Sequence, residues 1–314
     1  MNAIRKFRRN HPVLFSLAAI LACNVILMFV IGPIYYGTVA DFFDGSSRMR
    51  TGMGSIVCDA SLAVLCAIIL ALTGRAAVIA RKGQGFFKGL SVPGLVLCFE
   101  VVGILCMSCA GSLGGQEELP QEYAEAMKMF ENMSFDSGSV VVIIGFLMVG
   151  VGEEFLCRGI VGQTLLERFG TSRGGIWKAV VISSVFFALM HSINIFSGGD
   201  LVPISIQAAN AFFSGMFLAC VYFRTGNIWV VALIHGLNDI MASSSIWLYS
   251  GEGVISELNS TSAVGVEAGL GMVVVMGLFY TCLSLFLLRK SKIGEVEKNW
   301  QPELAEWRGE KDAA

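Results

Sequence analysis

Charged residues are scarce in this sequence, and their scarcity excludes an ordinary soluble domain. Asp, Glu, Lys and Arg make up 15% of the 314 residues, against about 25% in typical soluble proteins. Hydrophobic residues make up 55%, and the mean hydropathy is +0.70. The chain also lacks a basic patch, so nucleic acid is not an expected partner. The composition instead predicts a protein embedded in a lipid bilayer.

Apolar runs of about 20 residues, the length that crosses a bilayer as a helix, recur along the chain. We predict about eight such spans, at residues 13–35, 53–73, 90–111, 139–162, 177–197, 203–223, 227–248 and 266–288. The expected fold is therefore all-α, a polytopic bundle of transmembrane helices. Residues 1–292 would form one membrane-embedded domain, and residues 293–314 a charged, flexible cytoplasmic tail.

Lys and Arg cluster in alternate loops, as the positive-inside rule requires. This pattern predicts that both termini are cytoplasmic, in the cell membrane if the source is prokaryotic. The first apolar run is longer than a signal-peptide core, so we expect it to be retained. The basic residues assigned to the cytoplasmic side are Arg5, Lys6, Arg8, Arg9, Arg75, Arg81, Lys82, Lys88, Arg168, Arg173, Lys178, Arg224, Arg289, Lys290, Lys292 and Lys298.

Cysteines and most loops carry little functional signal. All nine cysteines fall within predicted spans, where they are expected to pack as small apolar side chains without a disulfide framework. Residues 112–138 form a long acidic connection, read as either a solvated loop or an interfacial helix. Asp59 and Glu100 also lie within spans, as members of a buried pair or as residues facing a cavity.

Two adjacent carboxylates inside an apolar run are the strongest functional signal. A carboxylate in hydrocarbon costs roughly 2.5–3.5 kcal/mol, so Glu153 and Glu154 need compensation or a chemical role. Glu154 and Arg158 are four residues apart and can pair on one helix face. Glu153 then points about 100° away as the freer carboxylate, suited to general acid–base chemistry. The alternative is a buried ion-pair cluster that only holds helices together.

Two of the three histidines also lie in apolar runs. Phe187 precedes His191 by one helical turn, and His235 precedes Asp239 by one turn. Asp239 can orient the His235 ring or act as the outer partner of a metal ligand. The alternative is hydrogen bonding between helices. At 1.5 Å per residue, Glu154, His191, His235 and Asp239 lie roughly 16–23 Å from the nearest cytoplasmic charge, which favours one site.

These three motifs resemble those of the CPBP intramembrane protease family, which includes type II CAAX prenyl endopeptidases and the Abi and bacteriocin-immunity proteins. The resemblance covers about residues 139–245, with a protease core expected at about 139–248. It rests on the order and spacing of Glu153-Glu154-x-x-x-Arg158, Phe187-x-x-x-His191 and His235-x-x-x-Asp239, and on Tyr222–Trp229, which is similar to the family's turn before the third motif.

The resemblance implies hydrolysis of a peptide bond in a membrane-associated or lipidated peptide or protein, such as a prenylated one. Glu153 and His191 would activate water, with Glu154 in the same catalytic set. His235 and Asp239 would stabilise the oxyanion. Asn238 is a rival donor, although its helical phase differs from that of His235. Arg158 and Phe187 would orient these groups.

A metal and two other functions stay open at this level. No H-E-x-x-H helix is present, but Glu153, His191 and His235 could hold zinc with one open position. The alternative functions are a non-catalytic immunity or scaffold protein and a proton-coupled transporter. The transporter is disfavoured because the chain shows neither an internal repeat nor matched broken helices.

Overall fold

A computed structural model of the chain describes residues 3–43, 46–83, 134–193, 195, 200–243, 247 and 262–308. In these ranges the regular elements are all helices, as predicted. Among the described residues, six helices are long and apolar enough to cross a membrane: Pro12–Phe43, Ser47–Leu72, Ser137–Phe169, Arg173–Ser192, Leu201–Thr225 and Gly269–Leu287. They correspond to six of the eight predicted spans.

The two remaining predicted spans have different outcomes. The span at 90–111, with Glu100, Cys98, Cys106 and Cys109, lies outside the described residues, as does most of the 112–138 connection. The span at 227–248 is the apolar helix α12 (Ile228–Ala242) of 15 residues. Its length of about 22 Å is shorter than the roughly 30 Å hydrocarbon core.

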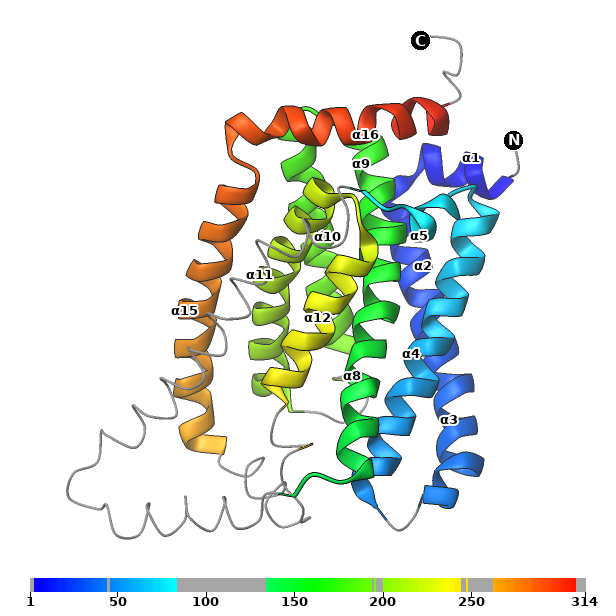
Figure 1. Cartoon of the computed structure of the whole chain (residues 1–314), viewed down its shortest axis with the longest axis vertical. Coiled ribbons are helices and arrows are strands. Elements are labelled where there is room, and N and C mark those ends of the chain that lie inside the picture. The colour runs from blue at the N-terminus through cyan, green and yellow to red at the C-terminus, as the bar shows by residue number, and fades with distance from the viewer. Residues whose placement is uncertain are drawn as a thin grey trace, which may run out of the picture.

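The helices run back and forth between two ends of one bundle (Figure 1). α2 (Pro12–Ile26) and α4 (Ser47–Leu72) precede the central helix, which consists of α8 (Ser137–Glu154), a π-helical segment η4 (Phe155–Gly162) and α9 (Gln163–Phe169). α10 (Arg173–Ser192), α11 (Leu201–Thr225), α12 and α15 (Ser262–Leu287) follow. α8 packs against α4 and α12, and α11 packs against α10 and α15.

Large apolar side chains remain on the outside of this bundle. Phe29, Val64, Val275 and Leu278 are each more than half exposed. Such a surface is unfavourable in water but suits lipid, and contiguous apolar patches of this kind mark membrane contact. The outward face and the six apolar helices define an integral membrane protein.

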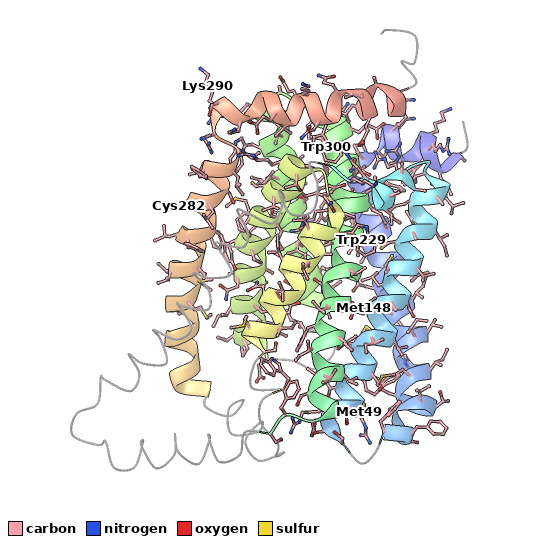
Figure 2. The ribbon with its side chains drawn as sticks, in the orientation of Figure 1. Met49, Met148, Trp229, Cys282, Lys290 and Trp300 are labelled. Atoms are coloured by element: carbon pink, nitrogen blue, oxygen red, sulfur yellow. The ribbon has the colours of Figure 1, made fainter. Side chains whose placement is uncertain are left out.

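The C-terminal segment differs from its prediction. The expected flexible tail is a helix over its first part, α16 (Ile293–Arg308), which lies across one end of the bundle beside α1 (Ala3–Asn10) (Figure 1). Trp300 lies beneath it, fully buried, and its Nε1–H donates to the Phe223 carbonyl at 2.6 Å (Figure 2). Arg81 stacks 3.9 Å from the centre of the Trp300 ring. A charge-rich segment is thus ordered by one buried aromatic side chain.

A tight turn fixes where α12 begins. Gly226 ends α11 in the left-handed conformation, at φ 66°, which glycine adopts without steric cost. Asn227 then caps α12, its Oδ1 accepting from the main-chain N–H groups of Trp229 and Val230 at 3.0 and 3.3 Å. Its Nδ2 donates to the Lys82 carbonyl. The turn therefore sets the start of the helix that carries His235.

Two glycines let α8 and α12 approach to backbone contact. A Cβ atom on Gly150 would lie 2.2 Å from the Ala232 carbonyl oxygen, and one on Gly236 would lie 2.8 Å from the Leu147 Cα. Neither position has room for a side chain. This approach places His235 beside Glu153 and Glu154.

Candidate active site

Glu153 and Glu154 are the last two residues of α8, where the α-helix passes into η4. π-helical turns are rare and occur mostly at functional sites. Every residue of η4 is buried, so the segment is held by packing on all sides. The sequence predicts a helix here but gives no sign of the change in winding.

Glu154 is the centre of a fully buried network. Its Oε1 accepts from Arg158 Nη1 at 2.9 Å, which confirms the predicted pairing one turn apart. The same Oε1 lies 2.8 Å from His235 Nδ1. Arg158 also donates from Nη2 to the Gly215 carbonyl at 2.8 Å, and its guanidinium lies over the Phe187 ring. Glu154 therefore ties together α8, η4, α11 and α12.

The hydrogen bonds of the two histidines fix which nitrogens face the site. His191 Nδ1 lies 2.9 Å from the Phe187 carbonyl oxygen, which can only accept, so Nδ1 carries the proton and Nε2 is left with its lone pair in the neutral ring. His235 Nδ1 likewise donates to the Glu154 carboxylate. In both rings Nε2 is the atom left for chemistry.

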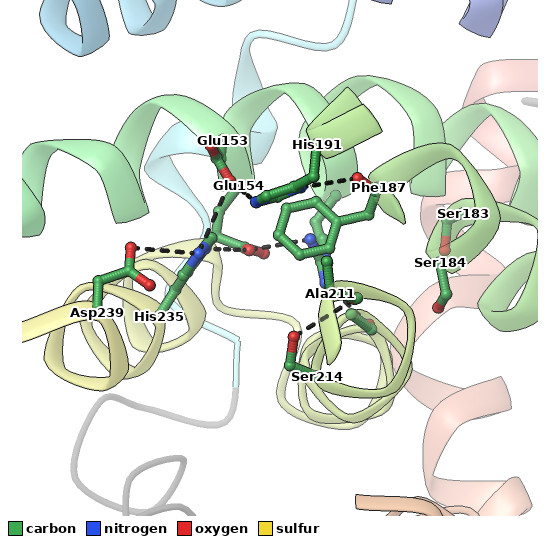
Figure 3. A network of polar contacts seen from close by, with 12 residues as sticks. Glu153, Glu154, Ser183, Ser184, Phe187, His191, Ala211, Ser214, His235 and Asp239 are labelled. Atoms are coloured by element: carbon green, nitrogen blue, oxygen red, sulfur yellow. Dashed lines mark hydrogen bonds and ion pairs between the residues drawn. The ribbon is translucent and has the colours of Figure 1, made fainter. Parts of the chain in front are cut away.

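Glu153 Oε2 faces both of these nitrogens. It lies 3.7 Å from His235 Nε2 and 3.9 Å from His191 Nε2, and it is buried without a hydrogen-bond partner among the described residues. The close view shows Glu153, His191 and His235 converging from α8, α10 and α12 (Figure 3). These separations exceed a direct hydrogen bond and are short enough for one water oxygen to bond to two of the groups.

Phe187 forms one wall of this space. Its ring meets His191 and His235 edge to face, with ring centres 4.7 and 5.5 Å apart. It is itself buried, and the missing side chain of Gly215 makes room for it, since a Cβ there would lie 2.9 Å from its Cδ1. Phe187 therefore restricts both imidazoles.

Asp239 joins the site, whereas Asn238 does not engage it directly. Asp239 Oδ2 lies 3.5 Å from His235 Nε2, one turn along α12. The Asn238 side chain makes no hydrogen bond within the described part of the chain. The structure thus brings together Glu153, Glu154, His191, His235 and Asp239, with Arg158 and Phe187 packed against them.

The three groups predicted to hold zinc have suitable donor atoms but not the arrangement of a metal site. Glu153 offers a carboxylate oxygen and the two histidines offer ring nitrogens, which zinc accepts. Within the described ranges, however, no three His, Cys, Asp or Glu side chains are placed so that they could hold an ion.

Asp59 on α4 is a neighbour of the site that the sequence did not assign to it. A Cβ on Gly152 would lie 3.2 Å from Asp59 Oδ1, so this carboxylate lies against the residue before Glu153. It is within electrostatic reach of Glu153, Asp239 and His235. In the sequence, Asp59 is recognisable only as an acidic residue inside an apolar run. It belongs to none of the three motifs that hold the other site residues.

The described cysteines do not take part in this Glu/His centre. Cys157 and Cys220 are buried in η4 and α11, and Cys23 and Cys66 lie in α2 and α4, all as free thiols. Cys58 and Cys282 are likewise free thiols, on α4 and α15.

A bundle of apolar helices that buries a Glu/His centre defines an integral membrane protein with a polar site among its helices. Residues 136–241 match the family model described as type II CAAX prenyl endopeptidase Rce1-like. This match supports the CPBP/CAAX protease family that the three motifs predicted for this segment. The matched segment begins at the cap of α8 and ends in α12, so it contains all three motifs. No curated protein and no solved structure matches the chain.

Proposed function

We propose that this protein is an intramembrane endopeptidase that hydrolyses a peptide bond of a membrane-associated or lipidated peptide or protein. The observation that carries the proposal is the unpartnered Glu153 Oε2 facing the Nε2 atoms of His191 and His235 at 3.9 and 3.7 Å. A carboxylate and an imidazole at this separation can both bond to one water molecule. The match to the Rce1-like family supports the same reaction class.

Glu153 would act as the general base and then as the general acid. Its carboxylate takes a proton from water while the water oxygen attacks the scissile carbonyl carbon. His191, whose Nδ1–H is engaged by the Phe187 carbonyl, holds the water through Nε2. Glu153 then gives the proton to the amide nitrogen as the carbon–nitrogen bond breaks, leaving a free carboxyl and a free amine.

His235 would stabilise the negative charge that develops on the carbonyl oxygen. In its imidazolium form it donates Nε2–H to this oxyanion, as preorganised donors do in acyl-transfer enzymes. Glu154 and Asp239 balance its positive charge from opposite ring nitrogens, at 2.8 and 3.5 Å. Glu154 is itself held by Arg158, so its role is to fix the ring rather than to exchange protons with water.

The alternative to this metal-free mechanism is a zinc ion held by the same three residues, Glu153, His191 and His235. In that case the ion would polarise water and carbonyl, and Glu154 and Phe187 would orient the ligating rings. The donor chemistry supports it, and the present placement of the side chains favours the glutamate mechanism.

The location of the site and the family match support a membrane-associated substrate. A peptide segment anchored in the bilayer, including a prenylated C-terminal tail, can reach a centre enclosed by apolar helices. In a prokaryotic plasma membrane a leader peptide, a bacteriocin-type peptide or a membrane-anchored regulator would take this place. We also propose that both termini lie on the cytoplasmic side. The basic residues near α1 and α16 support this orientation.

The proposal is tested by cleavage of quenched fluorescent peptides, lipidated and unlipidated, by the purified protein in detergent or vesicles. Glu153→Gln and His191→Ala are expected to lower kcat/KM by about 10²–10⁴-fold, the usual contribution of a general base. Glu297→Gln and His11→Ala are matched controls far along the chain. Equal cleavage by all five proteins would contradict the catalytic roles of Glu153 and His191. No cleavage by stably folded wild type would favour the immunity or scaffold alternative.

A further inference from the structure

Asp59 lies on α4 against the end of α8 that carries Glu153. A Cβ on Gly152 would lie 2.9 Å from the Asp59 main-chain oxygen and 3.2 Å from its Oδ1. Glu153 is the next residue along α8. The α4 helix lies wholly outside the segment that matches the Rce1-like family, so neither the motifs nor the match assigns Asp59 a role.

The Asp59 carboxylate has no polar partner among the described residues. It makes no hydrogen bond or ion pair with any residue that the structure describes, although it is half-buried among apolar helices. The ionisable groups within its electrostatic reach are Glu153 on α8 and His235 and Asp239 on α12. His235, the one cationic group among them, is already bonded to Glu154. A carboxylate without a donor in such surroundings is costly unless something binds it.

We infer that Asp59 is a substrate-binding residue, whose carboxylate accepts hydrogen bonds from main-chain N–H groups of the peptide next to the scissile bond. This inference rests on the proposed function. An extended peptide that enters an apolar bundle carries N–H donors that lose their water, so each needs an acceptor. Asp59 offers such an acceptor beside Glu153, on the α4 side of the site. Its contribution is to hold the peptide, while Glu153 carries out the proton transfer.

The direct test measures peptide binding without turnover. In a Glu153→Gln background, the Kd for a labelled substrate peptide is compared by fluorescence anisotropy with and without Asp59→Ala. Loss of a hydrogen bond to a charged group predicts a Kd raised at least about tenfold. Asp59→Asn keeps one carbonyl acceptor and is expected to fall in between. Ser61→Ala is the matched control, since its hydroxyl bonds only the Val57 carbonyl of its own helix.

Steady-state kinetics separate binding from other roles of Asp59. In otherwise wild-type protein, Asp59→Ala should raise KM about tenfold and change kcat by less than about threefold. An unchanged Kd and KM would overturn the inference. A loss of kcat alone would also overturn it and assign Asp59 to the electrostatics of Glu153. Cleavage that survives Glu153→Gln would instead sink the proposed function, whatever Asp59 does.

Discussion

Gly150 of α8 contacts the backbone of α12 so closely that a Cβ would lie 2.2 Å from the Ala232 carbonyl oxygen. This contact sets how near His235 comes to the two glutamates. The site therefore depends on an absent side chain as much as on those that are present.

Gly150→Ala is expected to force α8 and α12 apart and to separate His235 from Glu154. Overpacking of this kind typically costs about 1–3 kcal/mol of stability, and cleavage should fall more than tenfold because the Glu153–His235 geometry is lost. The measurements are thermal unfolding and kcat/KM. Gly174→Ala is the control, since a Cβ at Gly174 meets no atom within 4 Å. Normal activity of Gly150→Ala would contradict the dependence on this contact.

Arg158→Met should destabilise the protein strongly by leaving the Glu154 carboxylate buried without its cation. Breaking a buried pair from one side costs about 3–5 kcal/mol. The double variant Arg158→Met/Glu154→Gln removes the uncompensated charge, so it should recover part of the loss in thermal unfolding. A double variant less stable than Arg158→Met would show that the pair is not the source of the effect.

Trp300→Ala should detach α16 from the end of the bundle. Replacing a buried Trp by Ala typically costs about 3–5 kcal/mol, and the bond to the Phe223 carbonyl and the stacking of Arg81 are lost as well. Limited proteolysis should then cleave within Ile293–Arg308 faster than in wild type. Lys298→Ala, at an exposed position of the same helix, should leave the cleavage rate unchanged.

A strong chelator should leave cleavage intact if Glu153 activates water without a metal. The comparison is the initial rate after dialysis against the chelator, with and without added zinc. Loss of activity that zinc restores would replace the glutamate mechanism by the zinc alternative at the same residues.

Asp136 should stabilise the start of α8 in a pH-dependent way. Its side chain accepts from the Ser139 N–H at 2.9 Å, and this main-chain hydrogen bond lowers the pKa of Asp136. Because the folded pKa lies below the unfolded one, the stabilisation is present above the unfolded value and is lost as pH falls through the folded value. The Tm difference between wild type and Asp136→Ala should therefore hold near neutral pH and shrink below about pH 4. An equal difference at pH 3 and pH 7 would contradict this.

Local spacing predicted the contacts within single helices well. The pairing of Glu154 with Arg158 and the proximity of His191 to Phe187 and of His235 to Asp239 follow from one helical turn of separation. The class of fold and six of the spans follow from the length of the apolar runs. These features depend on residues close in sequence, so a pattern is enough to find them.

Contacts between segments far apart in the sequence could not be predicted from such local patterns. The approach at Gly150 and Gly236, the position of Asp59 and the docking of Trp300 each depend on how whole helices pack. The charges of residues 293–308 indicated a solvated tail, because sequence does not show that Phe223 and Arg81 would form a site for one tryptophan. The π-helical winding of η4 likewise arises from packing around it.

Adjacency of Glu153 and Glu154 has a consequence for how the chain tolerates change. Consecutive residues of a helix point about 100° apart. The Glu154 carboxylate is therefore held by Arg158 and His235, whereas the Glu153 carboxylate faces His191. A single-residue insertion or deletion in α8 would rotate one carboxylate into the place of the other while the composition stayed almost the same. The site therefore tolerates a substitution at most positions of α8 better than a change in the number of its residues.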